Sequence, residues 1–91
     1  METVWLDVRM WTGLRGNFHP FMDVACDAPD PPPIVAAEWQ RWAHSYLGAV
    51  AQEESWQAGR YAYSAELRDE DGRTVEVLTR GQWEWNATAN A

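Results

Sequence analysis

The sequence RYAYSAELRDEDGRTVEVLTR, residues 60–80, decides the fold class of this chain of 91 residues. In its first nine residues apolar and polar side chains alternate, which is typical of a β-strand with one buried face. Its last eight residues alternate again and place Val75, Val77 and Thr79 on one face. Residues 69–72, DEDG, form a strong turn signal between the two runs. The stretch therefore predicts a β-hairpin.

The segment before this hairpin, residues 34–58, predicts a helix. Its apolar side chains recur at spacings of four, three, four and four, close to the period of an α-helix. We expect Pro33 in the first turn, where its missing N–H is not needed, and Gly59 as a left-handed C-terminal cap. The apolar stripe that should rest on a sheet consists of Val35, Trp39, Trp42, Tyr46 and Val50, with Ala43 and Leu47 beside it.

Further towards the N-terminus, residues 3–12 alternate and predict another strand. A glycine-containing turn, residues 13–16, follows, and a second strand-like run places Phe18, Met22 and Val24 on one face. Pro20 within that run cannot donate a hydrogen bond to a neighbour, so we expect an edge strand or a bulged one. Together the two runs predict a hairpin from residue 3 to about residue 25. The proline-rich residues 27–33 should form an extended spacer.

After the hairpin of residues 60–80, Gly81-Gln82 interrupts the pattern, and Trp83-Glu84-Trp85 predicts a last short strand. The predicted element order is ββαβββ. Hairpins around one helix indicate an α+β domain, in which a small antiparallel sheet of four to five strands carries one long helix on one face. We expect a single domain over residues 1–91, with residues 86–91 as a flexible tail.

The charge of the chain favours some partners over others. Fourteen acidic residues face seven bases, all arginine, so the net charge is -7. This charge disfavours direct binding to nucleic acid or to an anionic membrane and favours a basic protein partner. Cys26 is the only cysteine, and the N-terminal sequence does not have the pattern of a signal peptide. We therefore expect a cytoplasmic protein without disulfides.

Candidate catalytic and metal-binding groups are sparse. A nucleophilic pair of Cys26 with His19 or His44 needs an electropositive setting, whereas Asp23 and Asp27 lie close to Cys26 in sequence. A zinc site made of His19, Asp23 and Cys26 lacks a fourth ligand at a recognisable spacing. The chain has no phosphate-binding loop and no nucleophile elbow. We predict a protein that is not an enzyme and that has no cofactor and no metal.

The chain is unusually rich in tryptophan, with seven. One helix on a small sheet offers limited room for so many rings, since each aromatic side chain buries about 150–250 Å². Two interpretations stay open. Trp5 or Trp11 pairs with Trp83 or Trp85 across adjacent strands and stabilises the sheet, or the second face of the sheet is an aromatic interface.

Our first functional hypothesis is a small non-catalytic inhibitor that occludes a basic protein partner. In size and charge the chain is similar to phage anti-defence proteins, including anti-CRISPR proteins, and to bacterial toxin-immunity proteins. A second candidate for the partner is another copy of the same chain, which would make a homodimer. An acidic patch that includes Glu76 would steer the partner. The predicted partner-binding residues are Trp5, Trp11, Trp83, Trp85, Glu66, Asp69, Glu70 and Asp71.

Two alternative functions come from other classes. In the first, Trp5, Trp11, Trp83 and Trp85, with an arginine such as Arg9, line a pocket for a sugar or a nucleotide. In the second, the chain is a structural subunit whose edge strand extends the sheet of a neighbour in a larger assembly.

Overall fold

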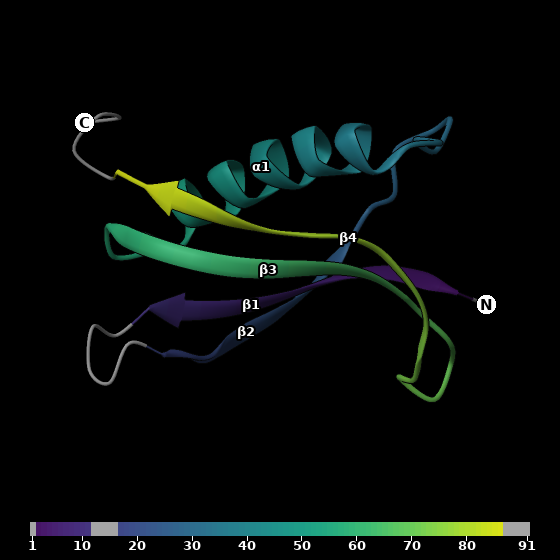
Figure 1. Ribbon diagram of the computed structural model, residues 1–91, viewed down its shortest axis with the longest axis horizontal. Helices are drawn as coiled ribbons and strands as arrows, with labels where there is room; N and C mark the ends of the chain where they lie inside the picture. The colour runs from purple at the N-terminus through teal and green to yellow at the C-terminus, as the bar shows by residue number, and fades with distance from the viewer. Residues whose placement is uncertain (1, 12–16, 87–91) are drawn as a thin grey trace.

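The structure, a computed structural model, describes residues 2–11 and 17–86. These residues form, in chain order, β1 (Thr3–Trp11), β2 (Phe18–Cys26), α1 (Ala36–Glu53), β3 (Gly59–Arg68) and β4 (Thr74–Trp85). Within the described residues the strands make one antiparallel sheet in the order β2-β1-β3-β4, and α1 lies on one of its faces (Figure 1). The predicted α+β class, with one helix packed on a small antiparallel sheet, is confirmed.

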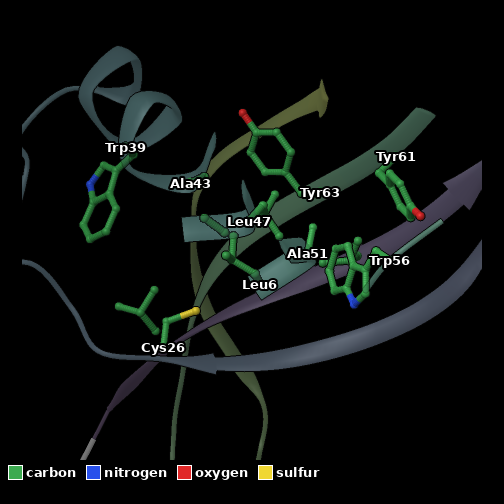
Figure 2. Packing of buried hydrophobic residues seen from close by; sticks show 12 residues of the cluster. Leu6, Cys26, Trp39, Ala43, Leu47, Ala51, Trp56, Tyr61 and Tyr63 are labelled. Carbon is green, nitrogen blue, oxygen red and sulfur yellow. The ribbon is translucent and has the colours of Figure 1, made fainter. Parts of the chain in front are cut away.

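The core lies between α1 and the sheet, as Figure 2 shows. From β1, Val4, Leu6 and Val8 point towards the helix and are buried, because side chains of a strand alternate between faces. The opposite residues of β3, Ala65 and Tyr63, complete the centre of this covered face. The intervening side chains of the same strands lie on the other face, which α1 does not cover and which we call the uncovered face.

The buried stripe of α1 agrees with the predicted one only in part. Every fourth residue of the helix is buried, namely Trp39, Ala43, Leu47 and Ala51. The predicted members Trp42, Tyr46 and Val50 are only half-buried along its flank, and Val35 precedes the helix and is exposed. Small alanines at the centre let the helix backbone approach the sheet, so the bulky rings lie beside the contact.

The helix also ends earlier than predicted, at Glu53. The residue with a left-handed backbone is Ser55, with φ 57°, and Gly59 instead begins β3. The N–H of Trp56 donates to the carbonyl of Ala51 at 2.9 Å, which closes the last turn in a Schellman motif. This turn directs the Trp56 ring into the core. At the other end the N-cap is Val35, so Pro33 lies before the helix and not in its first turn.

The two last predicted strands are a single strand, β4, of 12 residues, so the observed order is ββαββ. Gly81 does not interrupt it. A Cβ at this position would lie 2.8 Å from the hydroxyl oxygen of Tyr63, so a residue without a side chain lets β4 pass the tyrosine ring. Register shifts in β4 separate its apolar residues. Thr79 is buried under the helix, whereas Val77 pairs with Glu66 on the uncovered face.

Both expectations for β2 are confirmed: it is an edge strand, and its pairing with β1 shifts register between Val8 and Arg9. The irregularity separates Phe18, opposite Trp11 on the uncovered face, from Met22, opposite Val8. The prediction that Phe18, Met22 and Val24 share a face is therefore wrong for Phe18, whereas Met22 and Val24 do share the covered face. The turn expected at residues 13–16 and the tail from residue 87 onward lie outside the described residues. The turn at residues 69–72 joins β3 and β4 as predicted, with Gly72 at φ 81°.

Candidate functional site

The four tryptophans predicted to share one surface lie on opposite faces of the sheet. Trp5 is paired with Glu66 and Trp11 with Phe18, on the uncovered face. Trp83 is paired with the buried Tyr61, and Trp85 follows two residues later on the same, covered face. The structure therefore contradicts a stack between the two pairs and a ligand pocket lined by all four rings.

Trp83 and Trp85 belong to an aromatic cluster at the end of the helix. Their rings stack with centroids 5.6 Å apart, and Trp83 also contacts Tyr61 and Trp56. The indole N–H of Trp85 donates to the carbonyl of Trp56 at 3.1 Å. These contacts fasten the end of β4 to the segment that follows α1. The two rings at the end of the chain thus have a structural role within the monomer.

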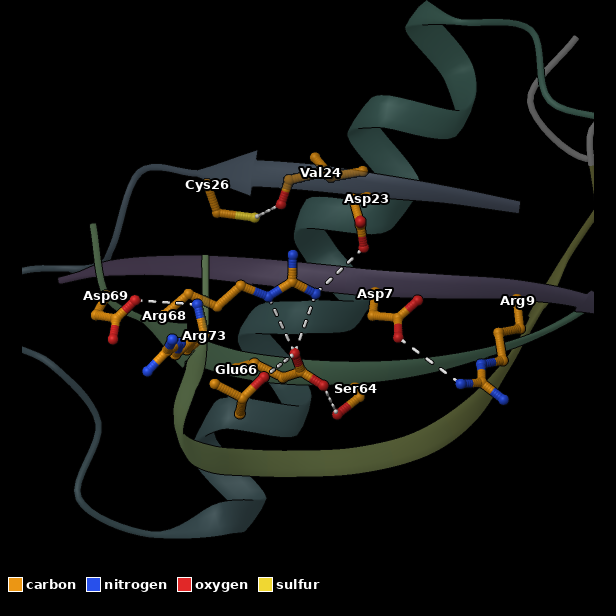
Figure 3. Close-up of polar contacts among 11 residues, drawn as sticks. Asp7, Arg9, Asp23, Val24, Cys26, Ser64, Glu66, Arg68, Asp69 and Arg73 are labelled. Carbon is orange, nitrogen blue, oxygen red and sulfur yellow. Dashed lines mark hydrogen bonds and ion pairs between the residues drawn. The ribbon is translucent and has the colours of Figure 1, made fainter. Parts of the chain in front are cut away.

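Trp5 is held differently, on the uncovered face, by Arg68, whose ion pairs with Asp23 and Glu66 are drawn in Figure 3. The guanidinium of Arg68 lies 5.2 Å from the centre of its ring, a cation–π contact. Arg68 in turn pairs with Asp23 at 3.2 Å and with Glu66 at 3.0 Å. One arginine therefore joins strands β1, β2 and β3 across this face.

Glu66, one of the predicted partner-binding acids, already has three partners. Its carboxylate accepts hydrogen bonds from the hydroxyls of Ser64 and Thr74 and from the guanidinium of Arg68. Burial by itself would raise the pKa of Glu66, but these hydrogen bonds and the charge of Arg68 outweigh it and lower the pKa. The negative charge of Glu66 is therefore already paired within the protein.

The uncovered face forms a shallow hollow of about 490 Å³ beside Phe18, whose ring lies against that of Trp11 with centroids 5.0 Å apart. Ala62 and Ser64 leave room at the centre of the hollow. It is also lined by Asp7, Arg9, Phe18, Glu66, Arg80 and Gln82.

The acids of the β3–β4 turn differ in their hydrogen bonds and exposure. The carboxylate of Asp69 accepts the backbone N–H groups of Asp71 at 2.9 Å and of Arg73 at 3.0 Å. Asp69 therefore stabilises the turn, as Asp does when it bonds to backbone two residues on. Glu70 and Asp71 are exposed at the tip of the same turn.

A second groove, of about 570 Å³, lies where the start of β1, the end of β2 and the segment leading to α1 meet. In Figure 1 this is the end of the molecule that also carries the β3–β4 turn. We call it the acidic groove. Its apolar lining includes Val4, Cys26, Trp39, Leu67 and Leu78, with Pro32, Pro33 and Ile34 along one side. Its acidic lining consists of Glu2, Asp27 and Glu76.

The three carboxylates of the acidic groove form no ion pair with any residue that the structure describes. Beside them, Ile34 is 94% exposed, the most exposed large apolar side chain in the described part of the chain. Sequence reasoning missed Ile34 and Asp27 as site residues and placed Trp39 only in the core stripe. A signal was present, because Ile34 follows three prolines and lies outside the predicted stripe.

Cys26 forms part of this groove but is not poised as a nucleophile. Burial, the largest cause, raises the pKa of the thiol to about 12, and Asp27 adds a small contribution in the same direction. The thiol donates to the carbonyl of Val24 at 3.3 Å. His44 lies elsewhere, with Nε2 3.0 Å from the hydroxyl of Tyr63. Across the described ranges, no three His, Cys, Asp or Glu side chains are arranged to hold a metal ion.

No family model, curated protein or solved structure matches this chain. In the part of the chain that the structure describes, no helix has the length and apolar character needed to cross a membrane.

Proposed function

We propose that this protein is a small non-catalytic protein-binding domain that takes a basic segment of a partner protein into the acidic groove. The proposal is supported by the combination of apolar and acidic groups in this groove. An apolar floor that includes Trp39 lies beside three carboxylates, Glu2, Asp27 and Glu76, without ion-pair partners among the described residues.

This combination suits the side chain of arginine or lysine. Such a side chain lays its aliphatic stem on an apolar surface and keeps its charged end among polar groups. In the groove the stem would contact Leu67 and Leu78, and the cation would lie near the carboxylate of Glu76. A neighbouring apolar residue of the partner would contact the exposed Ile34. An apolar centre with a polar rim is the usual anatomy of a protein interface.

The long-range electrostatic field of the molecule also favours a basic partner. Seven of the fourteen acids lie at the end of the molecule that bears the groove, against two arginines, Arg68 and Arg73, so this end is negative. Such a field attracts a basic surface and raises the rate of encounter. These acids are Glu2, Asp27, Asp30, Asp69, Glu70, Asp71 and Glu76.

The proposed site keeps one part of the surface predicted from sequence and replaces another. The acids of the turn, Glu70 and Asp71, remain as the rim that attracts the partner. The aromatic centre becomes Trp39, in place of the four tryptophans on opposite faces of the sheet. The proposed mode of action is occlusion of a basic functional surface, in line with the compositional similarity to anti-defence and immunity proteins.

A fluorescence-anisotropy titration tests this proposal with a labelled peptide of alternating leucine and arginine. We expect binding that weakens at high salt, and no binding of the matched peptide with glutamine in place of arginine. Asp27→Gln and Glu76→Gln should each raise the Kd about twofold to fivefold, the effect of losing one exposed ion pair. Glu53→Gln, at the far end of α1, is the matched control. An equal effect of Glu53→Gln and Glu76→Gln would rule out the groove as the site.

A further inference from the structure

The uncovered face of the sheet is balanced in charge, although the chain as a whole is not. Among the described residues, four acids and four arginines lie on this face. The net charge of -7 is therefore carried entirely by the rest of the molecule. The charged residues of the face are Asp7, Asp23, Glu66, Glu84, Arg9, Arg60, Arg68 and Arg80.

This distribution decides how two copies can meet. Copies with a charge of -7 repel each other through their acidic surfaces. The uncovered face has no net charge, so the local repulsion is smallest there, and acids of one copy can lie opposite arginines of the other. A surface that pairs with itself in this way is what a two-fold symmetric dimer requires.

The face also has the composition of an interface. Tryptophan and arginine are the residues most enriched among energetically dominant contacts, and here Trp5 and Trp11 lie among the arginines. Arg80 has no side-chain hydrogen bond or ion pair with any described residue, so its guanidinium is available to a second molecule. Among the residues that the structure describes, Arg9 pairs only with Asp7, at 4.0 Å.

We infer that a second copy of this chain docks on the uncovered face, so that two sheets pack face to face in a symmetric dimer. The pair of Trp11 and Phe18 at the edge of the face in one copy would pack over the hollow at Ala62 and Ser64 in the other. There the two rings would lie near Arg9 and Arg80, whose guanidiniums attract aromatic faces.

The small area of the face indicates a weak dimer. Strands about 4.8 Å apart and about eight residues long, at about 3.3 Å per residue, give the four-stranded sheet a projected face of roughly 500 Å². Two such faces bury about 1,000 Å², near the lower limit for a specific interface. The dimer should therefore be weak, with a Kd in the micromolar range, and should not need the acidic groove.

Sedimentation velocity from about 1 μM to 1 mM protein tests the inference. We expect the average mass to rise from that of the monomer, 10.4 kDa, towards twice this value. Arg80→Glu should raise the dimer Kd at least about tenfold, because it places like charges in the interface. Arg41→Glu, an equal change of charge on exposed helix surface, should alter it much less. A monomer at every concentration, or equal effects of the two variants, would overturn the inference.

A pair of complementary variants separates loss of the interface from loss of the fold. Arg9→Glu with Arg80→Glu makes the face acidic, and Asp23→Arg with Glu84→Arg makes it basic. Each double variant alone should be a monomer with a cooperative thermal transition. An equimolar mixture should form a heterodimer at least as tight as the wild-type dimer. A mixture that stays monomeric while the wild type dimerises would place the interface on another surface.

Discussion

On the helix-covered face of the sheet, Trp83 and Trp85 join Trp56 in a cluster with several ring contacts and a hydrogen bond. On the uncovered face, Trp5 lies against one arginine and Trp11 against one phenylalanine. The same residue type thus packs in a cluster of several rings on one face and makes single contacts on the other. Counting tryptophans cannot tell these roles apart, because the distinction depends on which face α1 covers.

Substitutions that remove one ring from each face should differ most in their effect on the free energy of unfolding. Trp56→Ala should lower the free energy of unfolding by about 3–5 kcal/mol, because it leaves a cavity among buried rings. Trp11→Ala loses mainly one edge contact, which is worth about 0.5–1.5 kcal/mol. Urea unfolding followed by circular dichroism measures both. If Trp56→Ala does not fold, Trp56→Leu can be measured instead, because it keeps part of the side-chain volume. It should still lose more stability than Trp11→Ala. Similar losses on the two faces would contradict the comparison.

A methyl group added on the covered face should have the next largest effect on the free energy of unfolding. Gly81→Ala places a Cβ 2.8 Å from the Tyr63 hydroxyl, and such overpacking costs about 1–3 kcal/mol. Gly48→Ala is the matched control, because a Cβ there meets no atom within 4 Å. Inside a helix this change should stabilise the protein by about 1 kcal/mol. The thermal midpoints should move in opposite directions, and a shared direction would refute the explanation of Gly81.

On the uncovered face, the stability supplied by Glu66 should depend on pH. Its pKa is lower in the folded protein than in the unfolded chain, so its contribution is present above the unfolded pKa and is lost as pH falls through the folded one. Urea midpoints should therefore fall more steeply below about pH 4.5 for the wild type than for Glu66→Gln. Parallel curves for the two proteins would show that the Arg68 network adds no stability.

The elements of this fold could be predicted because their signals are local. Alternation in residues 60–68, the DEDG turn and Pro20 at an edge each depend on neighbouring residues alone. The errors arose where tertiary packing decided the outcome. Gly81 resembles a turn residue until Tyr63 is seen beside it. The helix ends at Glu53 because the following turn directs Trp56 into the core. The register shifts of β4 likewise have no local signal.

The candidate site was harder to predict than the fold, because distant segments assemble it. Glu2, Asp27 and Glu76 come from the start of the chain, the end of β2 and β4. Their convergence depends on the strand order, which the sequence did not provide. The acids of the turn were predicted because they are adjacent in sequence, and they now lie at the rim of the proposed site rather than at its centre.

The central claim is that the acidic groove, and not the uncovered face of the sheet, receives a basic partner segment. A titration of ¹⁵N-labelled protein with the unlabelled leucine–arginine peptide, followed by amide chemical shifts, tests it most directly. The account predicts that the largest shifts occur at Glu2, Asp27, Ile34, Glu76 and their neighbours, with little change at Arg9 or Arg80. Shifts centred on the uncovered face, or none at millimolar peptide, would contradict it.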